Sequence, residues 1–167
     1  MADLFELTLA LDLRDELSVG EVAELHWHLG SGPMPEKLRI VTDFPVVTED
    51  EQGGFIIENR PEPLLGQQGA AYKVGGVLVS VLLRRQDTKT DVWALTSRQE
   101  IHPDDFERTG ELLGWLAARA GERHKGPDGS VVLGWIRFHE ECRPHPLIVS
   151  DGTVVWPSTT PHGSLPF

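Results

Sequence analysis

The clearest pattern in the chain is an alternation of apolar and polar residues near its start. Every second residue from Phe5 to Leu13 is Phe or Leu. The residues between them are mainly polar: Glu6, Thr8, Ala10 and Asp12. A period of two residues is typical of a β-strand that buries one face. We therefore predict a strand over residues 5–13 whose even-numbered side chains face away from the core.

Two later segments have the apolar spacing of helices. Ser18 and Glu21 form a capping-box pair, and the apolar residues that follow recur at helical spacing, which predicts a helix over residues 19–29. Pro103, followed by two acidic residues, is typical of a helix start. The apolar stripe after it predicts a second helix that ends near Ala120.

Further strands are predicted at residues 77–85, 91–97 and 130–140, because these runs are rich in β-branched and alternating apolar residues. With the first strand and the two helices, the order of elements is βαββαβ. The sequence therefore predicts an α+β fold of the ferredoxin-like type, in which an antiparallel sheet carries two helices on one face. A C-terminal β-hairpin over residues 147–156 is expected to follow the fourth strand.

The spacing of these elements predicts one domain over residues 1–156. The segment 31–76 is an insertion much longer than a compact plait needs, with two short strand patterns at 38–47 and 54–58. Residues 157–167 contain three prolines and are expected to form an extended C-terminal tail.

Composition narrows the classes of partner. The 167 residues include 26 acidic and 15 basic side chains, a formal charge of -11. This charge disfavours nucleic acid and anionic membrane surfaces, and no apolar run approaches the roughly 20 residues that span a bilayer. Cys142 is the only cysteine, which excludes an intrachain disulfide and is typical of a reducing compartment. We expect a cytoplasmic protein that binds neither nucleic acid nor membrane.

Two tryptophans have an unusual position on the predicted helices. Helical geometry places Trp27 and Trp115 away from the centres of the apolar stripes on their helices, so both need cover. One interpretation is that the insertion or the tail packs on them. The other is that they form an interface between copies of the chain, because aromatic residues are enriched at interfaces.

The sheet face opposite the helices holds the best candidate binding site. If the odd-numbered residues of the first strand face the helices, the even-numbered ones line the open face. The fourth strand sends further polar and aromatic side chains there, and its antiparallel pairing with the first places Glu6 near Arg137 or His139. The candidate ligand-binding residues are Glu6, Asp12, Trp135, Arg137 and His139. A set of cross-strand ion pairs on a wet sheet face is the other interpretation.

Motifs for catalysis or metal binding are weak. His139, Cys142 and His145 are spaced by three residues and are metal-binding types, but structural zinc sites usually have two ligand clusters. Ser97 and His102 lack the motif that accompanies a serine nucleophile. The paired glycines do not continue into a nucleotide-binding loop. We therefore predict no catalytic residue, no metal and no cofactor, although metal binding by His139, Cys142 and His145 stays open.

These observations favour a cytosolic domain that self-associates as a homo-oligomer and binds a small molecule or a protein partner. The alternative is a small enzyme with Glu6, Asp12, Arg137 and His139 as acid, base and anchor in a cleft between the sheet and residues 31–76. The fold does not choose between these functions.

Overall fold

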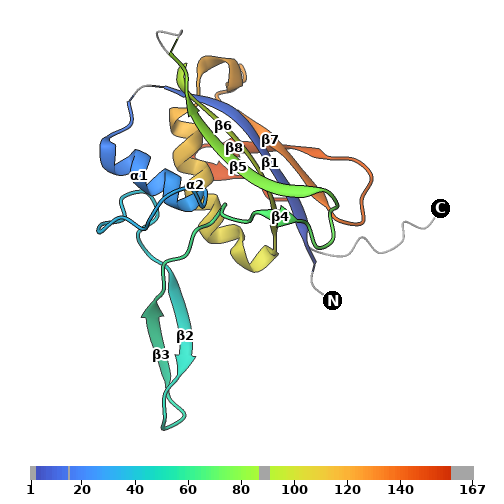
Figure 1. Cartoon of the computed structure of the whole chain (residues 1–167). Coiled ribbons are helices and arrows are strands. Elements are labelled where there is room, and N and C mark those ends of the chain that lie inside the picture. Colours follow the sequence, from blue (N-terminus) through green and yellow to red (C-terminus); the bar gives the residue numbers. More distant parts are fainter. Residues whose placement is uncertain (1–2, 15, 87–90, 159–167) are drawn as a thin grey trace, which may run out of the picture.

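The computed structural model describes residues 3–14, 16–86 and 91–158, and these residues form nine strands and two α-helices (Figure 1). In chain order the strands are β1 (Phe5–Arg14), β2 (Pro45–Glu49), β3 (Phe55–Asn59), β4 (Gly69–Ala70), β5 (Val77–Arg84), β6 (Asp91–Ile101), β7 (Val131–Phe138), β8 (His145–Ser150) and β9 (Thr153–Val154). The helices are α1 (Val19–His28) and α2 (Phe106–Arg119), with two short 3₁₀ turns, η1 (Pro103–Asp105) and η2 (Glu122–His124).

The predicted ferredoxin-like plait is wrong. The main sheet has seven antiparallel strands in the order β4-β5-β6-β1-β7-β8-β9, and β2 and β3 form a separate two-stranded sheet. The prediction missed β4, which pairs with β5 through only two residues, and it left the terminal hairpin β8–β9 outside the sheet that this hairpin extends. β4 and the β8–β9 hairpin both lie at edges of the main sheet. An edge strand has unpaired backbone N–H and C=O groups, with which a short segment can form hydrogen bonds.

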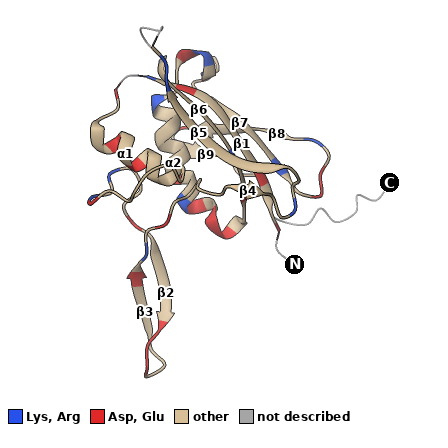
Figure 2. Cartoon of the chain, in the orientation of Figure 1, with Lys and Arg blue, Asp and Glu red and all other residues tan. Residues whose placement is uncertain are grey.

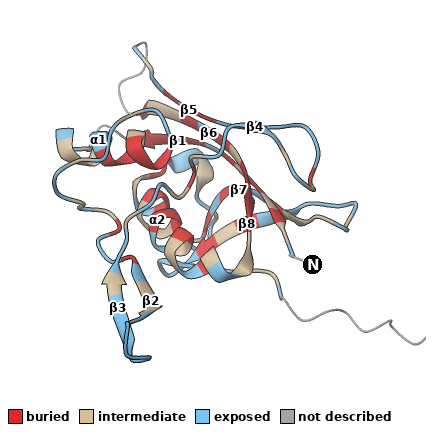
Figure 3. Ribbon diagram, turned by 60° about the horizontal axis from the view of Figure 1, so that its bottom comes forward, coloured by how far each residue is buried: buried red, intermediate tan, exposed pale blue. Residues whose placement is uncertain are grey.

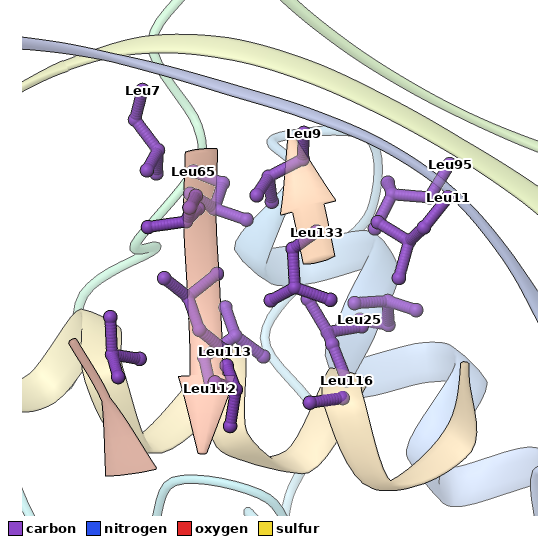
Figure 4. Close-up of a cluster of buried hydrophobic side chains, with 14 of the residues drawn as sticks. Leu7, Leu9, Leu11, Leu25, Leu65, Leu95, Leu112, Leu113, Leu116 and Leu133 are labelled. Carbon is purple, nitrogen blue, oxygen red and sulfur yellow. The ribbon is translucent and has the colours of Figure 1, made fainter. Parts of the chain in front are cut away.

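The core lies between the sheet and the two helices. The odd-numbered side chains of β1 are buried, as the alternation predicts. Leu7, Leu9 and Leu11 of this strand point toward α2 and toward Leu25 of α1 (Figure 4). The core residues of α2 include Leu112, Leu113 and Leu116, which follow the helical period. One face of the main sheet is therefore dry and helix-covered.

The helix starts follow the sequence closely. The Ser18 hydroxyl accepts a hydrogen bond from the Glu21 N–H at 3.1 Å, and the Glu21 carboxylate accepts one from the Ser18 N–H at 3.0 Å. This confirms the predicted capping box. The second helix begins with η1, where the His102 ring accepts a hydrogen bond from the Asp104 N–H at 3.1 Å.

The two tryptophans have different environments. Trp27 is buried, and Phe44 of the insertion packs near it with a ring-centroid distance of 6.3 Å. This confirms that the insertion covers Trp27. Trp115 is partly buried against the core, and the guanidinium of Arg119 lies 4.1 Å from its ring. Trp27 therefore cannot form an interface between copies.

The start of the insertion is attached to α1 by a buried carboxylate. Glu24 accepts hydrogen bonds from the N–H groups of Arg39, Ile40 and Val41, and its second interaction is with the His28 ring at 3.2 Å. Because these N–H groups bond to a side chain, residues 38–44 do not form the first half of the predicted strand 38–47, and β2 begins only at Pro45.

A bulge in β7 changes which side chains reach each face. The register with β8 shifts between Val132 and Gly134, and Gly134 has a φ of 154°. A Cβ at this glycine would lie 1.9 Å from the Thr8 carbonyl oxygen, so the close approach of β7 to β1 needs glycine. As a result Leu133 is buried and Val132 is exposed, whereas simple alternation predicts the reverse.

Candidate functional site

The face of the main sheet opposite the helices is the candidate site, and we call it the open face. Thr8 pairs with Arg98 on one side and Trp135 on the other, and Val81 pairs with Thr96, which pairs with Ala10. Because directly paired residues share a face, these side chains form rows across β5, β6, β1 and β7. The members that carry apolar surface are Ala10, Val79, Val81, Leu83, Thr96, Val132 and Trp135.

One end of the open face is an ion-pair network centred on Glu6. The predicted approach to Arg137 is confirmed, because the two residues pair in register and Arg137 Nε lies 3.4 Å from Glu6 Oε1. Arg98 forms a second ion pair with the same carboxylate. Both guanidinium groups also donate hydrogen bonds to backbone carbonyls, among them Gly75 and Glu141 at 2.7 Å. Arg98 and Arg137, both paired with Glu6, thus hold loops over this end.

Glu100, which the sequence analysis missed, completes this end. Its buried carboxylate accepts hydrogen bonds from the N–H groups of residues 72–74 at 2.5 to 3.1 Å. Burial raises the pKa of Glu100, but these three bonds and the charge of Arg98 outweigh burial, so the net pKa lies below its ordinary value. Glu100 therefore stays ionised and fixes this segment of the insertion. No sequence signal identified Glu100, because the predicted strand ended at residue 97, whereas β6 extends to Ile101.

Asp12 lies at the other end of β1. Its carboxylate contacts Arg85 at 3.0 Å and Arg123 at 3.3 Å, and the side chain is mostly buried. Six residues of extended strand separate Asp12 from Glu6, a distance of about 20 Å. The structure therefore does not bring these two candidate residues into one site.

Trp135 forms the floor of a shallow hollow of about 330 Å³. The hollow is also lined by Ala10 and Val132 and by the segment from Arg123 to Gly126. This volume is at the lower limit for small-molecule sites. Binding of a small molecule by Trp135 and its neighbours stays a prediction.

The histidine and cysteine candidates do not converge. His139 interacts through Nδ1 with the Leu4 carbonyl oxygen at 3.1 Å, and His145 lies 3.3 Å from Glu141. Cys142 is exposed. Among the described residues, no group of three His, Cys, Asp or Glu side chains has a geometry that could hold a metal ion.

Ser97 and His102, considered above as a nucleophile and its base, have different partners in the structure. Ser97 is fully buried, and its hydroxyl lies 2.6 Å from that of Ser80. His102 caps η1 instead. Ser97 is thus a structural residue between β5 and β6.

The exposed side of β5 is the feature that sequence reasoning missed. Its odd-numbered residues Val77, Val79, Val81 and Leu83 are 42 to 63% exposed, whereas Leu78, Ser80 and Leu82 are buried. Apart from Ser80, the odd-numbered and the even-numbered residues of β5 up to Leu83 are all apolar, which is typical of a strand covered on both faces. Only the placement of the helices showed which side is uncovered.

A comparison with protein-family models, curated proteins and solved structures finds no match for this chain, so no relative supplies a function. Across the part of the chain that the structure describes, none of the helices has the length and apolar character needed to cross a bilayer.

Proposed function

We propose that this protein is a cytosolic self-associating interaction domain whose binding surface is the open face. The observation that carries the proposal is the apolar row across four central strands. Val81, Val132 and Trp135 are each 38 to 49% exposed, and Thr96 and Ala10 between them are exposed as well. A contiguous apolar surface of this kind is typical of a protein interaction site.

The two ends of the open face support this proposal. Loops held by Arg98, Arg137 and Glu100 border one end, and Asp12 with Arg85 borders the other. The apolar row thus has a charged rim, as in many protein interfaces. A cytosolic location agrees with the single free cysteine, Cys142.

An enzyme is less well supported by the same geometry. Glu6 and Asp12, the predicted acidic groups, lie at opposite ends of β1, and each carboxylate already contacts two arginines. A general acid or base must reach the proton that it transfers, and these carboxylates are engaged in ion pairs with the protein's own arginines.

The test is the oligomeric state of the full chain with and without a charge on the open face. Wild type is expected to associate as its concentration rises in sedimentation velocity. Val81→Glu places a charge at the β5 end of the apolar row, so it should shift the chain to the monomer. Val19→Glu is the matched control, because Val19 is 90% exposed at the start of α1, away from the open face.

Circular dichroism checks that both variants keep the fold. A wild-type chain that stays monomeric at the highest concentration contradicts the proposal. So does a folded Val81→Glu variant that associates as strongly as wild type.

A further inference from the structure

The hairpin formed by β2 and β3 projects from the body of the protein (Figure 1). We call residues 45–59 the arm. Its base is fixed at Phe44, which donates from its N–H to the Asn59 side chain at 2.7 Å and accepts a hydrogen bond from the Arg60 N–H at 2.9 Å. An isolated two-stranded hairpin is marginal in water, so an arm of this kind needs a surface to pack against.

One face of the arm is apolar and uncovered. Val47 pairs with Ile57, and Glu49 pairs with Phe55 two positions further along, so these residues share a face. Val47, Ile57 and Phe55 are 64%, 73% and 83% exposed. Figure 3 shows most of β3 in the colour of exposed residues. Three large apolar side chains thus point into solvent side by side.

The tip of the arm is acidic. Glu49, Asp50 and Glu51 follow the apolar face toward the turn, and Figure 2 shows acidic residues in red at the far end of the hairpin. Asp50 also shapes this turn, since its carboxylate accepts hydrogen bonds from the N–H groups of Gln52 and Gly54. The order along the arm is therefore apolar first and then negative.

The open face has the complementary order. Along β5 the exposed valines and Leu83 are followed by Arg85, and Arg123 of η2 lies at the same end of the sheet, where the two guanidinium groups share the single carboxylate of Asp12 and so leave a net positive charge. The exposed part of β5 from Val77 to Leu83 is about 20 Å long, close to the roughly 17 Å of a five-residue arm strand. One orientation of an arm would then place apolar on apolar and acidic on basic.

We infer that the arm of one copy docks across the open face of a second copy, with Phe55, Ile57 and Val47 on the apolar row and the acidic tip near Arg85 and Arg123. Reciprocal docking of two arms closes the contact in a two-fold dimer. The inference rests on the proposed function, since it names what the open face binds. If the open face binds a second copy without the arm, the inference is wrong while the proposed function holds.

The experiment compares sedimentation of the full chain with three variants. Phe55→Ser with Ile57→Ser removes the apolar face of the arm and should weaken association by about tenfold or more. Glu51→Lys reverses an exposed tip charge and leaves the apolar face intact. It should weaken association at low ionic strength, and the difference from wild type should shrink at high ionic strength. Val81→Glu adds a charge to the open face and should prevent docking there.

Mixing the variants gives the sharpest result. A Val81→Glu chain keeps its arm, and a Phe55→Ser, Ile57→Ser chain keeps its open face. The mixture should therefore form a heterodimer through one remaining contact, at concentrations where each variant alone is monomeric. Val19→Glu mixed with Val81→Glu controls for the added charge. Isotopically or fluorescently labelled chains separate the species.

Three outcomes would overturn the inference. If both arm variants associate like wild type while Val81→Glu does not, the open face binds a second copy by another route and only the arm is excluded. If the mixture forms no heterodimer, arm docking is wrong even if each single variant is weakened. If wild type is a monomer, the proposed function fails and the inference fails with it.

Discussion

Leu82 and Leu83 are neighbours on β5, yet Leu82 is 8% exposed and Leu83 is 63% exposed. The same contrast runs across β1, where Leu9 is fully buried and Ala10 is exposed. The two α-helices, α1 and α2, both lie against one face of the main sheet (Figure 1). The comparison shows that an apolar side chain stabilises the fold on one face and is available for binding on the other.

The two faces should therefore respond differently to the same substitution, and this is the largest effect we expect. Leu113→Ala removes a fully buried side chain of α2 and should lower the free energy of unfolding by about 2 to 5 kcal/mol. Leu83→Ala removes an exposed one and should change it by less than about 0.5 kcal/mol. Urea unfolding at a concentration where both chains are monomeric measures the two values. Equal losses would mean that the two faces do not differ in cover.

The carboxylate of Glu100 holds residues 72–74 over one end of the open face, which gives a second test. Glu100→Gln replaces an acceptor of three N–H groups by an amide that carries donors itself, and should cost about 1 to 3 kcal/mol at neutral pH. Glu111→Gln on the exposed side of α2 is the matched control and should have little effect.

The pH dependence gives the sign of the Glu100 contribution. Because the pKa of Glu100 in the folded chain lies below 4.5, its stabilisation is complete above about pH 5 and declines as the pH falls through that folded pKa. The difference between wild type and Glu100→Gln should narrow in acid. A difference that is unchanged in acid would exclude the carboxylate as its cause.

The helix-covered side has its own buried carboxylate, and the smallest effect concerns the imidazole beside it. Burial lowers the pKa of His28 below 6.5, although its bond to Glu24 opposes this. The unfolded chain then binds the proton more readily, so stability is complete above about pH 7 and falls as the pH drops below 6.5. The slope from this residue is at most about 1.4 kcal/mol per pH unit.

His28→Gln should remove that part of the slope between about pH 7 and pH 5 in urea unfolding. His145→Gln removes an exposed imidazole and is the matched control. If both variants lose the same slope, burial of His28 is not the source of the pH dependence.

Local patterns predicted much of the secondary structure. The alternation in β1, the capping box at Ser18 and the Pro103 helix start all follow from contacts between residues a few positions apart, and each is present in the structure. The pairing of Glu6 with Arg137 was also predictable, because antiparallel neighbours in a given register share a face. Residues 87–90, between the predicted strands 77–85 and 91–97, and most of the tail predicted at residues 157–167 lie outside the described residues.

Long-range packing decided the rest. The bulge at Gly134 reversed the faces of Val132 and Leu133, and the bonds from Glu24 kept residues 38–44 out of β2. Neither depends on a local period, because a bulge and a side-chain bond to a distant backbone each require a partner far away in the sequence.

The sequence by itself determined which residues alternate, where the helices begin and that the chain is acidic. Only the tertiary structure decided that seven strands share one sheet, that the arm leaves the body, and that the odd-numbered side chains of β5 are exposed. The reason is physical: periodicity reports which side chains point together, but the cover over each side comes from segments that are distant in the chain.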